Sequence, residues 1–100
     1  MGQQGMDSIL QARKECWFCG TTYNLHSHHI YFGANRKNSE KYGFKVWVCA
    51  EHHNMGGNGH CVHQCREMDL ELKRACQKKF EETHARVEFM RIIGKNYSNE

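Results

Sequence analysis

The sequence lacks the apolar segments that would direct a chain to a membrane or anchor it there. Its first ten residues, MGQQGMDSIL, contain neither the apolar centre nor the cleavage site of a secretory signal peptide. No apolar run approaches the roughly 20 residues that a transmembrane helix needs. A myristoylation signal is also missing, because Met6 stands where serine or threonine is required. We therefore expect a cytoplasmic protein with no membrane partner.

The chain also has little length with which to build a core. Its 100 residues predict a single domain, in which residues 1–6 form a flexible start. A chain of this size buries only about 60–65% of its unfolded surface, so it often benefits from an additional crosslink. The 6 cysteines could form disulfides in a secreted protein. In a reducing cytoplasm, metal-bound thiolates are the better interpretation.

The net charge of +3 is concentrated in one segment. Residues 31–45 contain four basic residues and one acidic residue, so this stretch alone equals the net charge of the whole chain. A basic segment beside a metal site suits a polyanion, although a solvated turn would have the same composition. The basic residues are Arg36, Lys37, Lys41 and Lys45, and the acidic one is Glu40.

The hydrophobic pattern predicts a small α+β fold with two strands. These strands are expected over residues 24–30 and 44–49, and the second one, F-K-V-W-V-C, is rich in β-branched and aromatic residues. Residues 31–43, which connect them, are too many for a tight hairpin. They predict an Ω-like loop with a functional role.

Helices are expected both before and after the two strands in the sequence. The Asp7-Ser8 pair can cap a short N-terminal helix that reaches residue 15. A short helix follows Cys49, and the pattern becomes helical again from about residue 62 to residue 83. The apolar residues of that helix form one stripe, which is most simply explained by packing in the core: Met68, Leu72, Ala75, Cys76 and Phe80. A shorter helix is expected to follow. It has Val87, Met90 and Ile93 on one face, and Gly94 ends it.

Two short motifs have the spacing of the halves of a structural zinc site. Cys16-x-x-Cys19 and Cys49-x-x-His52 each place two donor atoms about one edge of a tetrahedron apart. Gly20 permits the positive φ that lets backbone amides turn towards a thiolate. The motifs predict a closed Cys3His zinc site. The alternative is a set of ordinary buried cysteines with a surface histidine.

Of the histidines outside this predicted zinc site, four are candidates for metal-dependent chemistry: His28, His29, His53 and His63. Adjacent residues of a strand point to opposite faces, so His28 can bind a metal while His29 faces a substrate. A triad of His28, His53 and His63 would leave metal positions open for water and a phosphate oxygen. The alternative is a histidine-rich surface with no second metal.

The motifs C-x2-C-G, L-H-S-H-H-I and V-W-V-C-x2-H-H-N resemble those of the HNH endonucleases, which have ββα-metal folds. More specifically, the chain is similar to small zinc-containing HNH proteins of bacteriophages and prophages, including their K-F-E-E-T-H tail. The resemblance covers roughly residues 14 to 97. It implies a zinc-stapled ββα-metal core over residues 14–63 with a helical C-terminal extension over 64–97, and the host cytoplasm as the location of a phage-encoded protein.

The resemblance assigns roles to the histidines. His29 occupies the position of the general base, whereas His28 and His53 occupy positions of ligands to the catalytic metal. His63 resembles the third ligand better than His60 does, although both are left open. The middle asparagine of the HNH motif is missing, because the sequence there reads F-K-V. Asn35 or Asn38 could brace the loop in its place.

The function that the resemblance implies is metal-dependent hydrolysis of DNA phosphodiester bonds with low sequence specificity. The expected cofactors are a structural Zn2+ and one catalytic divalent ion, for which histidine ligands suit Zn2+, Ni2+ or Mn2+ more than Mg2+. Arg36, Lys37 and Lys41 are expected to contact the phosphate backbone.

Two other functions share these sequence features. One is a noncatalytic zinc-binding module for nucleic acid, and the other is a phage protein that binds a host protein through its charged C-terminal helices. The sequence does not determine whether the substrate is DNA or RNA. It also does not determine whether the protein is a monomer or a homodimer, which would place two sites on a duplex.

Overall fold

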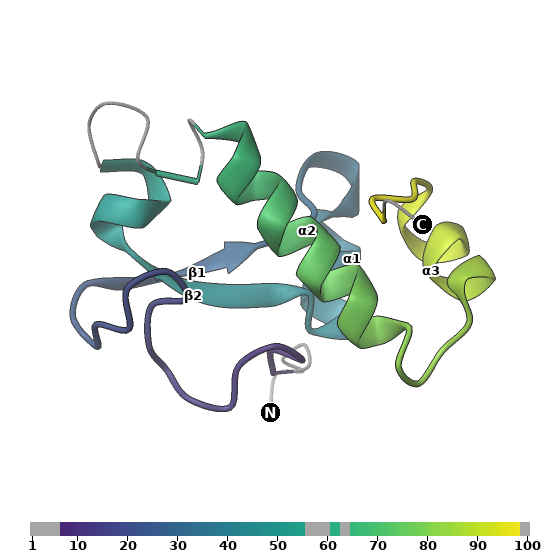
Figure 1. Cartoon of the computed structure of the whole chain (residues 1–100), viewed down its shortest axis with the longest axis horizontal. Coiled ribbons are helices and arrows are strands. Elements are labelled where there is room, and N and C mark those ends of the chain that lie inside the picture. Colours follow the sequence, from purple (N-terminus) through teal and green to yellow (C-terminus); the bar gives the residue numbers. More distant parts are fainter. Residues whose placement is uncertain (1–6, 56–60, 63–64, 99–100) are drawn as a thin grey trace.

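The computed structural model describes residues 7–55, 61–62 and 65–98. It is a small α+β arrangement of a two-stranded sheet and helices (Figure 1). In chain order the elements are strand β1 (Leu25–His29), a 3-10 turn η1 (Gly33–Asn35), helix α1 (Arg36–Tyr42), strand β2 (Lys45–Cys49), a π-helical turn η2 (Glu51–Met55), helix α2 (Arg66–Phe80) and helix α3 (Arg86–Ile93).

The two strands form an antiparallel pair, which confirms both strand predictions. Leu25 lies opposite Cys49 at one end of the pair, and His29 lies opposite Lys45 at the other. His28 faces Val46 across the pair. Because side chains alternate between faces, His28 and His29 leave the sheet on opposite sides.

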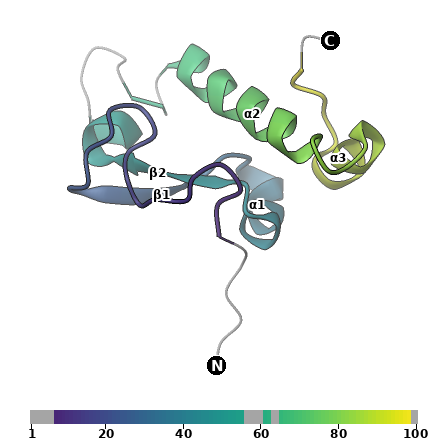
Figure 2. The ribbon, with the colours of Figure 1, turned by 60° about the horizontal axis from the view of Figure 1, so that its bottom comes forward.

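Helix α2 covers the sheet face to which His28 points. Figure 2 shows α2 running over the hairpin as a second layer. Val46 and Val48 on that face are 1% and 0% exposed, and they share one core cluster with Leu72 and Cys76 of α2. Among the helices that the structure describes, α2 is the longest, with 15 residues, and none is both long and apolar enough to cross a membrane.

Aromatic rings form the part of the core between α2 and α3. The ring centroids of Phe44 and Phe80 are 5.4 Å apart, and Tyr31 lies 5.5 Å from both Phe44 and Phe89. The prediction that Val87 lies on the buried face of α3 is wrong, because its side chain is exposed. The buried residue of this part of α3 is Phe89, which packs into the aromatic group.

Residues 31–43 do not form the predicted Ω-like loop, because they contain η1 and α1. The side-chain amides of Asn35 and Asn38 donate hydrogen bonds to the carbonyls of Ile93 and Ile92, at 2.9 and 3.1 Å. Gly43 ends α1 with a φ of 76°. Contacts with α3, far away in the sequence, therefore hold this segment in a compact helical form. Asn35 and Asn38 do brace it, against α3.

The predicted helix over residues 7–15 is also wrong, because the structure has no helix there. Ser8 makes the predicted cap, since its Oγ accepts hydrogen bonds from the amides of Leu10 and Gln11 at 3.0 and 3.1 Å. The helix does not continue. The Ile9 amide instead donates to the Gly43 carbonyl at 3.0 Å, and the side-chain oxygen of Gln11 accepts a hydrogen bond from the Trp47 amide at 2.7 Å. Contacts with β2 and the residues just before it therefore hold this segment.

Candidate metal centre and histidine cluster

The first cysteine pair lies on a tight turn in the N-terminal segment. The Gly20 amide donates to the Cys16 carbonyl at 2.8 Å, and the Cys16 amide donates to the Thr21 carbonyl at 2.8 Å. Gly20 has a φ of 79°, as its place after Cys19 predicts. This turn directs both sulfur atoms towards the end of β2.

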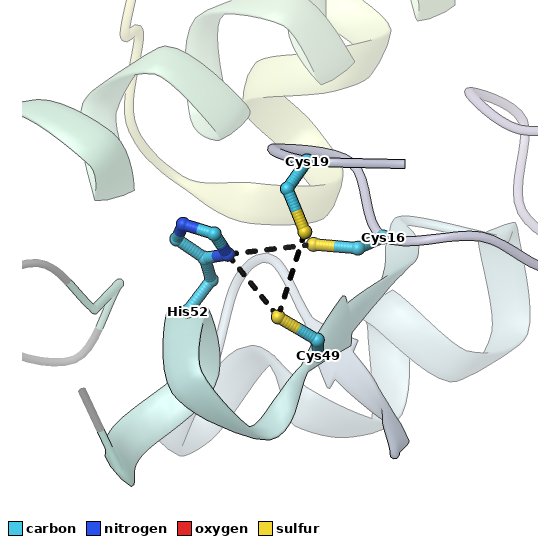
Figure 3. A group of neighbouring side chains, drawn as sticks. All are labelled: Cys16, Cys19, Cys49 and His52. Atoms are coloured by element: carbon cyan, nitrogen blue, oxygen red, sulfur yellow. Dashed lines mark hydrogen bonds between the residues drawn. The ribbon is translucent and has the colours of Figure 1, made fainter. Parts of the chain in front are cut away.

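The second pair comes from the end of β2 and the turn that follows it. Cys49 is the last residue of β2, and His52 lies in η2. Figure 3 shows the four side chains converging from these separate segments. The Nδ1 atom of His52 is 3.1 Å from the sulfur of Cys49 and 3.7 Å from that of Cys16, and the sulfurs of Cys19 and Cys49 are 3.8 Å apart. The four ligand atoms all lie within 4.8 Å of one another.

The surroundings of this Cys3His cluster favour a bound cation. Burial raises the pKa of the Cys16 thiol, but hydrogen bonds from the backbone amides of Cys49, Cys19 and Phe18 outweigh this effect and lower the pKa to about 6. Burial raises the pKa of Cys49, and the neighbouring thiols of Cys16 and Cys19 raise it further. Three thiolates so close together repel one another, and a metal ion removes that repulsion. Three sulfurs and one imidazole nitrogen are the donor set of a closed structural metal site.

A group of three histidine side chains lies beside the Cys3His cluster. His26 and His28 share one face of β1, and His53 reaches them from η2. The Nδ1 atoms of His26 and His53 are 3.1 Å apart, and the ring centroids of His28 and His53 are separated by 5.4 Å. We call these three residues the histidine cluster. His28 is its buried member, with an exposed fraction of 3%.

The imidazoles of the histidine cluster do not converge as the Cys3His ligands do. Within the described ranges, only the Cys3His cluster brings three or more ligand atoms within 4.8 Å of one another. The described residues of the histidine cluster therefore supply at most part of a metal site. Of the predicted ligands the structure brings His28 and His53 together, while His63 and its alternative His60 lie outside the described residues. His26 was missed, although its spacing of two from His28 in a strand indicates a shared face.

His29 lies on the other face of the sheet and is part of a polar row. Its Nε2 atom is 2.8 Å from Oε1 of Glu40, and Oε2 of Glu40 is 2.8 Å from Nζ of Lys45. Hydrogen bonds from Lys45 and then His29 lower the pKa of Glu40 to about 2. The carboxylate is therefore ionised at neutral pH. Sequence reasoning identified His29 but gave Glu40 no role.

The sheet face of His29 carries a basic groove. The cavity has a volume of ≈ 520 Å³ and runs between the N-terminal segment and the hairpin. The Nζ atom of Lys14 lies 4.4 Å from the centre of the Trp47 ring in this region. Three cations and one carboxylate line the groove: Arg13, Lys14, Lys45 and Asp7.

The predicted phosphate contacts all lie on α1. Arg36, Lys37 and Lys41 are exposed. The same helix supplies Glu40 to His29, so these cations and the polar row belong to one element. The contacts of these three residues with a ligand stay a prediction.

The fold and the two clusters define a small α+β protein with a Cys3His cluster that could hold a metal ion, in a small ββα-like arrangement. Comparison with known protein families found no matching family, and neither the curated proteins nor the solved structures gave a match.

Proposed function

We propose that this protein is a metal-dependent endonuclease of the HNH type, which hydrolyses phosphodiester bonds of DNA with low sequence specificity. The observation that carries the proposal is the division of the adjacent pair His28-His29. His28 lies against His53 beside the Cys3His cluster, while His29 leaves the opposite face of the sheet and contacts Glu40. This division supports one histidine as a metal ligand and its neighbour as a base.

The two clusters suit two different ions. The donor set of Cys16, Cys19, Cys49 and His52 suits a structural zinc ion, which would tie the N-terminal segment to the end of β2. His28 and His53, with the predicted ligand His63, would hold the catalytic divalent ion, and His26 adds an imidazole within 3.1 Å of His53. When bound, that ion supplies positive charge that stabilises the phosphate and the leaving 3′-oxygen.

His29 supplies the proton transfer. Its imidazole takes a proton from water as the water oxygen attacks phosphorus, so that a water O–H bond breaks and an O–P bond forms. The bond between phosphorus and the 3′-oxygen then breaks, and the 3′-oxygen is protonated from solvent. The products are a 5′-phosphate and a 3′-hydroxyl. The proton held by His29 is finally returned to solvent, which restores the neutral imidazole.

The cations of the fold explain low specificity. Arg36, Lys37 and Lys41 are exposed on α1, and Arg13 and Lys14 line the groove on the sheet face of His29. Contacts to phosphates fix the position of a nucleic acid but carry no sequence information. We therefore expect cleavage at many sites, and an affinity that falls steeply with salt concentration.

The test is plasmid nicking by the full chain across a panel of divalent metals. His29→Ala should lower the nicking rate by about 10²–10⁴-fold, the usual contribution of a general base, with unchanged metal content. His84→Ala is the matched control, because His84 is an exposed histidine beyond the end of α2. Binding of DNA with no metal-dependent nicking, and one ion per chain in place of two, would instead identify a noncatalytic module.

A further inference from the structure

A row of three side chains crosses the end of the strand pair at which the segment with α1 connects β1 to β2. His29 ends β1, Lys45 begins β2 directly opposite it, and Glu40 reaches between them from α1. Both links, His29 Nε2 to Glu40 Oε1 and Lys45 Nζ to Glu40 Oε2, measure 2.8 Å. The side chains of His29 and Lys45 are only 17% and 19% exposed. Both oxygens of the carboxylate are therefore engaged.

The chemistry of these groups determines which nitrogen of His29 carries hydrogen. An ionised carboxylate only accepts hydrogen bonds, and a lysine ammonium only donates them. Glu40 is ionised, because the Lys45 ammonium donates to its Oε2 at 2.8 Å and so favours the charged carboxylate. The 2.8 Å contact between Nε2 and Oε1 must then be a bond that Nε2–H donates. In the neutral ring the lone pair is left on Nδ1.

We propose that Glu40 is a positioning residue that fixes the neutral imidazole of His29 as its Nε2–H tautomer, so that Nδ1 is the atom that takes the proton from water. The assignment of Nδ1 as the base rests on the proposed nuclease function, whereas the tautomer itself does not. Glu40 also faces the positive charge that His29 acquires on protonation, as the buried aspartate does for the histidine of serine proteases.

Lys45 determines how the substitution Glu40→Gln would affect His29. In Glu40→Gln the amide keeps the shape of the carboxylate but has one oxygen and one NH2 group. Lys45 can only donate, so it will hold the amide oxygen and turn the NH2 group towards His29. Nε2 must then accept, which moves the hydrogen to Nδ1 and removes the lone pair from the proposed base atom. Removing Lys45 as well frees the amide to rotate back.

These relations predict a defined pattern of rates. Glu40→Gln should lower kcat for plasmid nicking on the order of 10²-fold or more, since a wrong tautomer removes general base catalysis, and should change KM by less than about threefold. Glu40→Gln combined with Lys45→Met should recover at least about tenfold of that loss. Glu82→Gln is the matched control, because Glu82 lies just beyond the end of α2 and its exposed carboxylate pairs with Lys79 at 3.3 Å.

The tautomer can be measured without any nuclease assay. Two-bond 15N–1H correlation spectra of the 15N-histidine-labelled, metal-loaded full chain at mildly alkaline pH distinguish Nδ1 from Nε2, and comparison with His29→Ala assigns the ring. We expect a protonated Nε2 in the parent and a shift to protonated Nδ1 in Glu40→Gln. A parent ring protonated at Nδ1 would overturn the proposal even if the variant does not fold. The expected spectra with no nicking by any form would refute the nuclease function but support the role of Glu40.

Discussion

Cys49→Ser tests the structural metal most directly. Cys49 is 7% exposed, and its sulfur lies 3.1 Å from His52 and 3.8 Å from Cys19, so it links both halves of the Cys3His cluster. It is also the last residue of β2, opposite Leu25. Serine is close to cysteine in shape, but its hydroxyl binds zinc far more weakly than a thiolate does.

The expected loss is large compared with the stability of the chain. Structural zinc contributes an apparent binding free energy of about 10–16 kcal/mol in zinc-finger peptides. The net stability of a domain is only about 5–15 kcal/mol. Loss of even ~4 kcal/mol of this binding would lower the Tm of a chain this size by about 15–30 °C. Cys49→Ser should therefore be unfolded or severely destabilised, and a chelator should have the same effect on the parent.

Thermal unfolding followed by circular dichroism, together with metal content measured by mass spectrometry, provides the assay. Cys65→Ser is the control, because Cys65 lies outside the cluster at the N-cap of α2, where serine is well tolerated. It should keep the metal content and Tm of the parent. If Cys49→Ser retained both, the Cys3His cluster would not be a structural metal site.

Two further predictions concern the fold around the site. Gly43→Ala should lose about 1–3 kcal/mol in urea unfolding, because Gly43 has a φ of 76° and an added Cβ would overlap the Asp7 carbonyl oxygen, whereas Gly94→Ala, with a φ of 89° and open space, should lose less. Acid should weaken the Glu40 links: the pKa of Glu40 is lowered from 4.5 to about 2, so their stabilisation is present above pH 4.5 and is lost as the pH falls towards 2. The side chain of Glu40 is 39% exposed, so the loss of stability in acid will be small. The urea midpoint of Glu40→Gln should therefore fall less than that of the parent between pH 4.5 and pH 2. Equal falls in the two proteins would contradict this.

The sequence predicted correctly those elements whose structure follows from the preferences of their own residues. The strand over residues 44–49 was predicted from its β-branched and aromatic residues, and the apolar stripe of α2 from its helical spacing. The N-terminal segment and α1 depend instead on distant partners. Gln11 binds the Trp47 amide, and Asn38 binds the Ile92 carbonyl. No local pattern in the sequence could indicate those contacts, so one predicted helix was wrong and a predicted loop contained a helix.

In the candidate site, too, local spacing predicted some contacts and distant parts of the chain supplied others. Ligand spacing predicted that Cys16, Cys19, Cys49 and His52 would meet, because each pair is fixed by a short turn. The link between His29 and Glu40 joins residues on different elements across the end of the hairpin. Glu40 appeared in the sequence only as the single acidic residue of a basic segment. The fold was needed to show what that carboxylate contacts.

The position of His52 next to His53 means that one turn serves both clusters. His52 points into the Cys3His cluster, while the neighbouring side chain meets His26 and His28. A metal ion in the Cys3His cluster would therefore also fix the place of His53. If the proposed nuclease function holds, substitutions of the cysteines should rank with those of the histidines in a mutational scan scored by nicking activity. Metal supply in the cell would then set the fraction of molecules that are competent to cut.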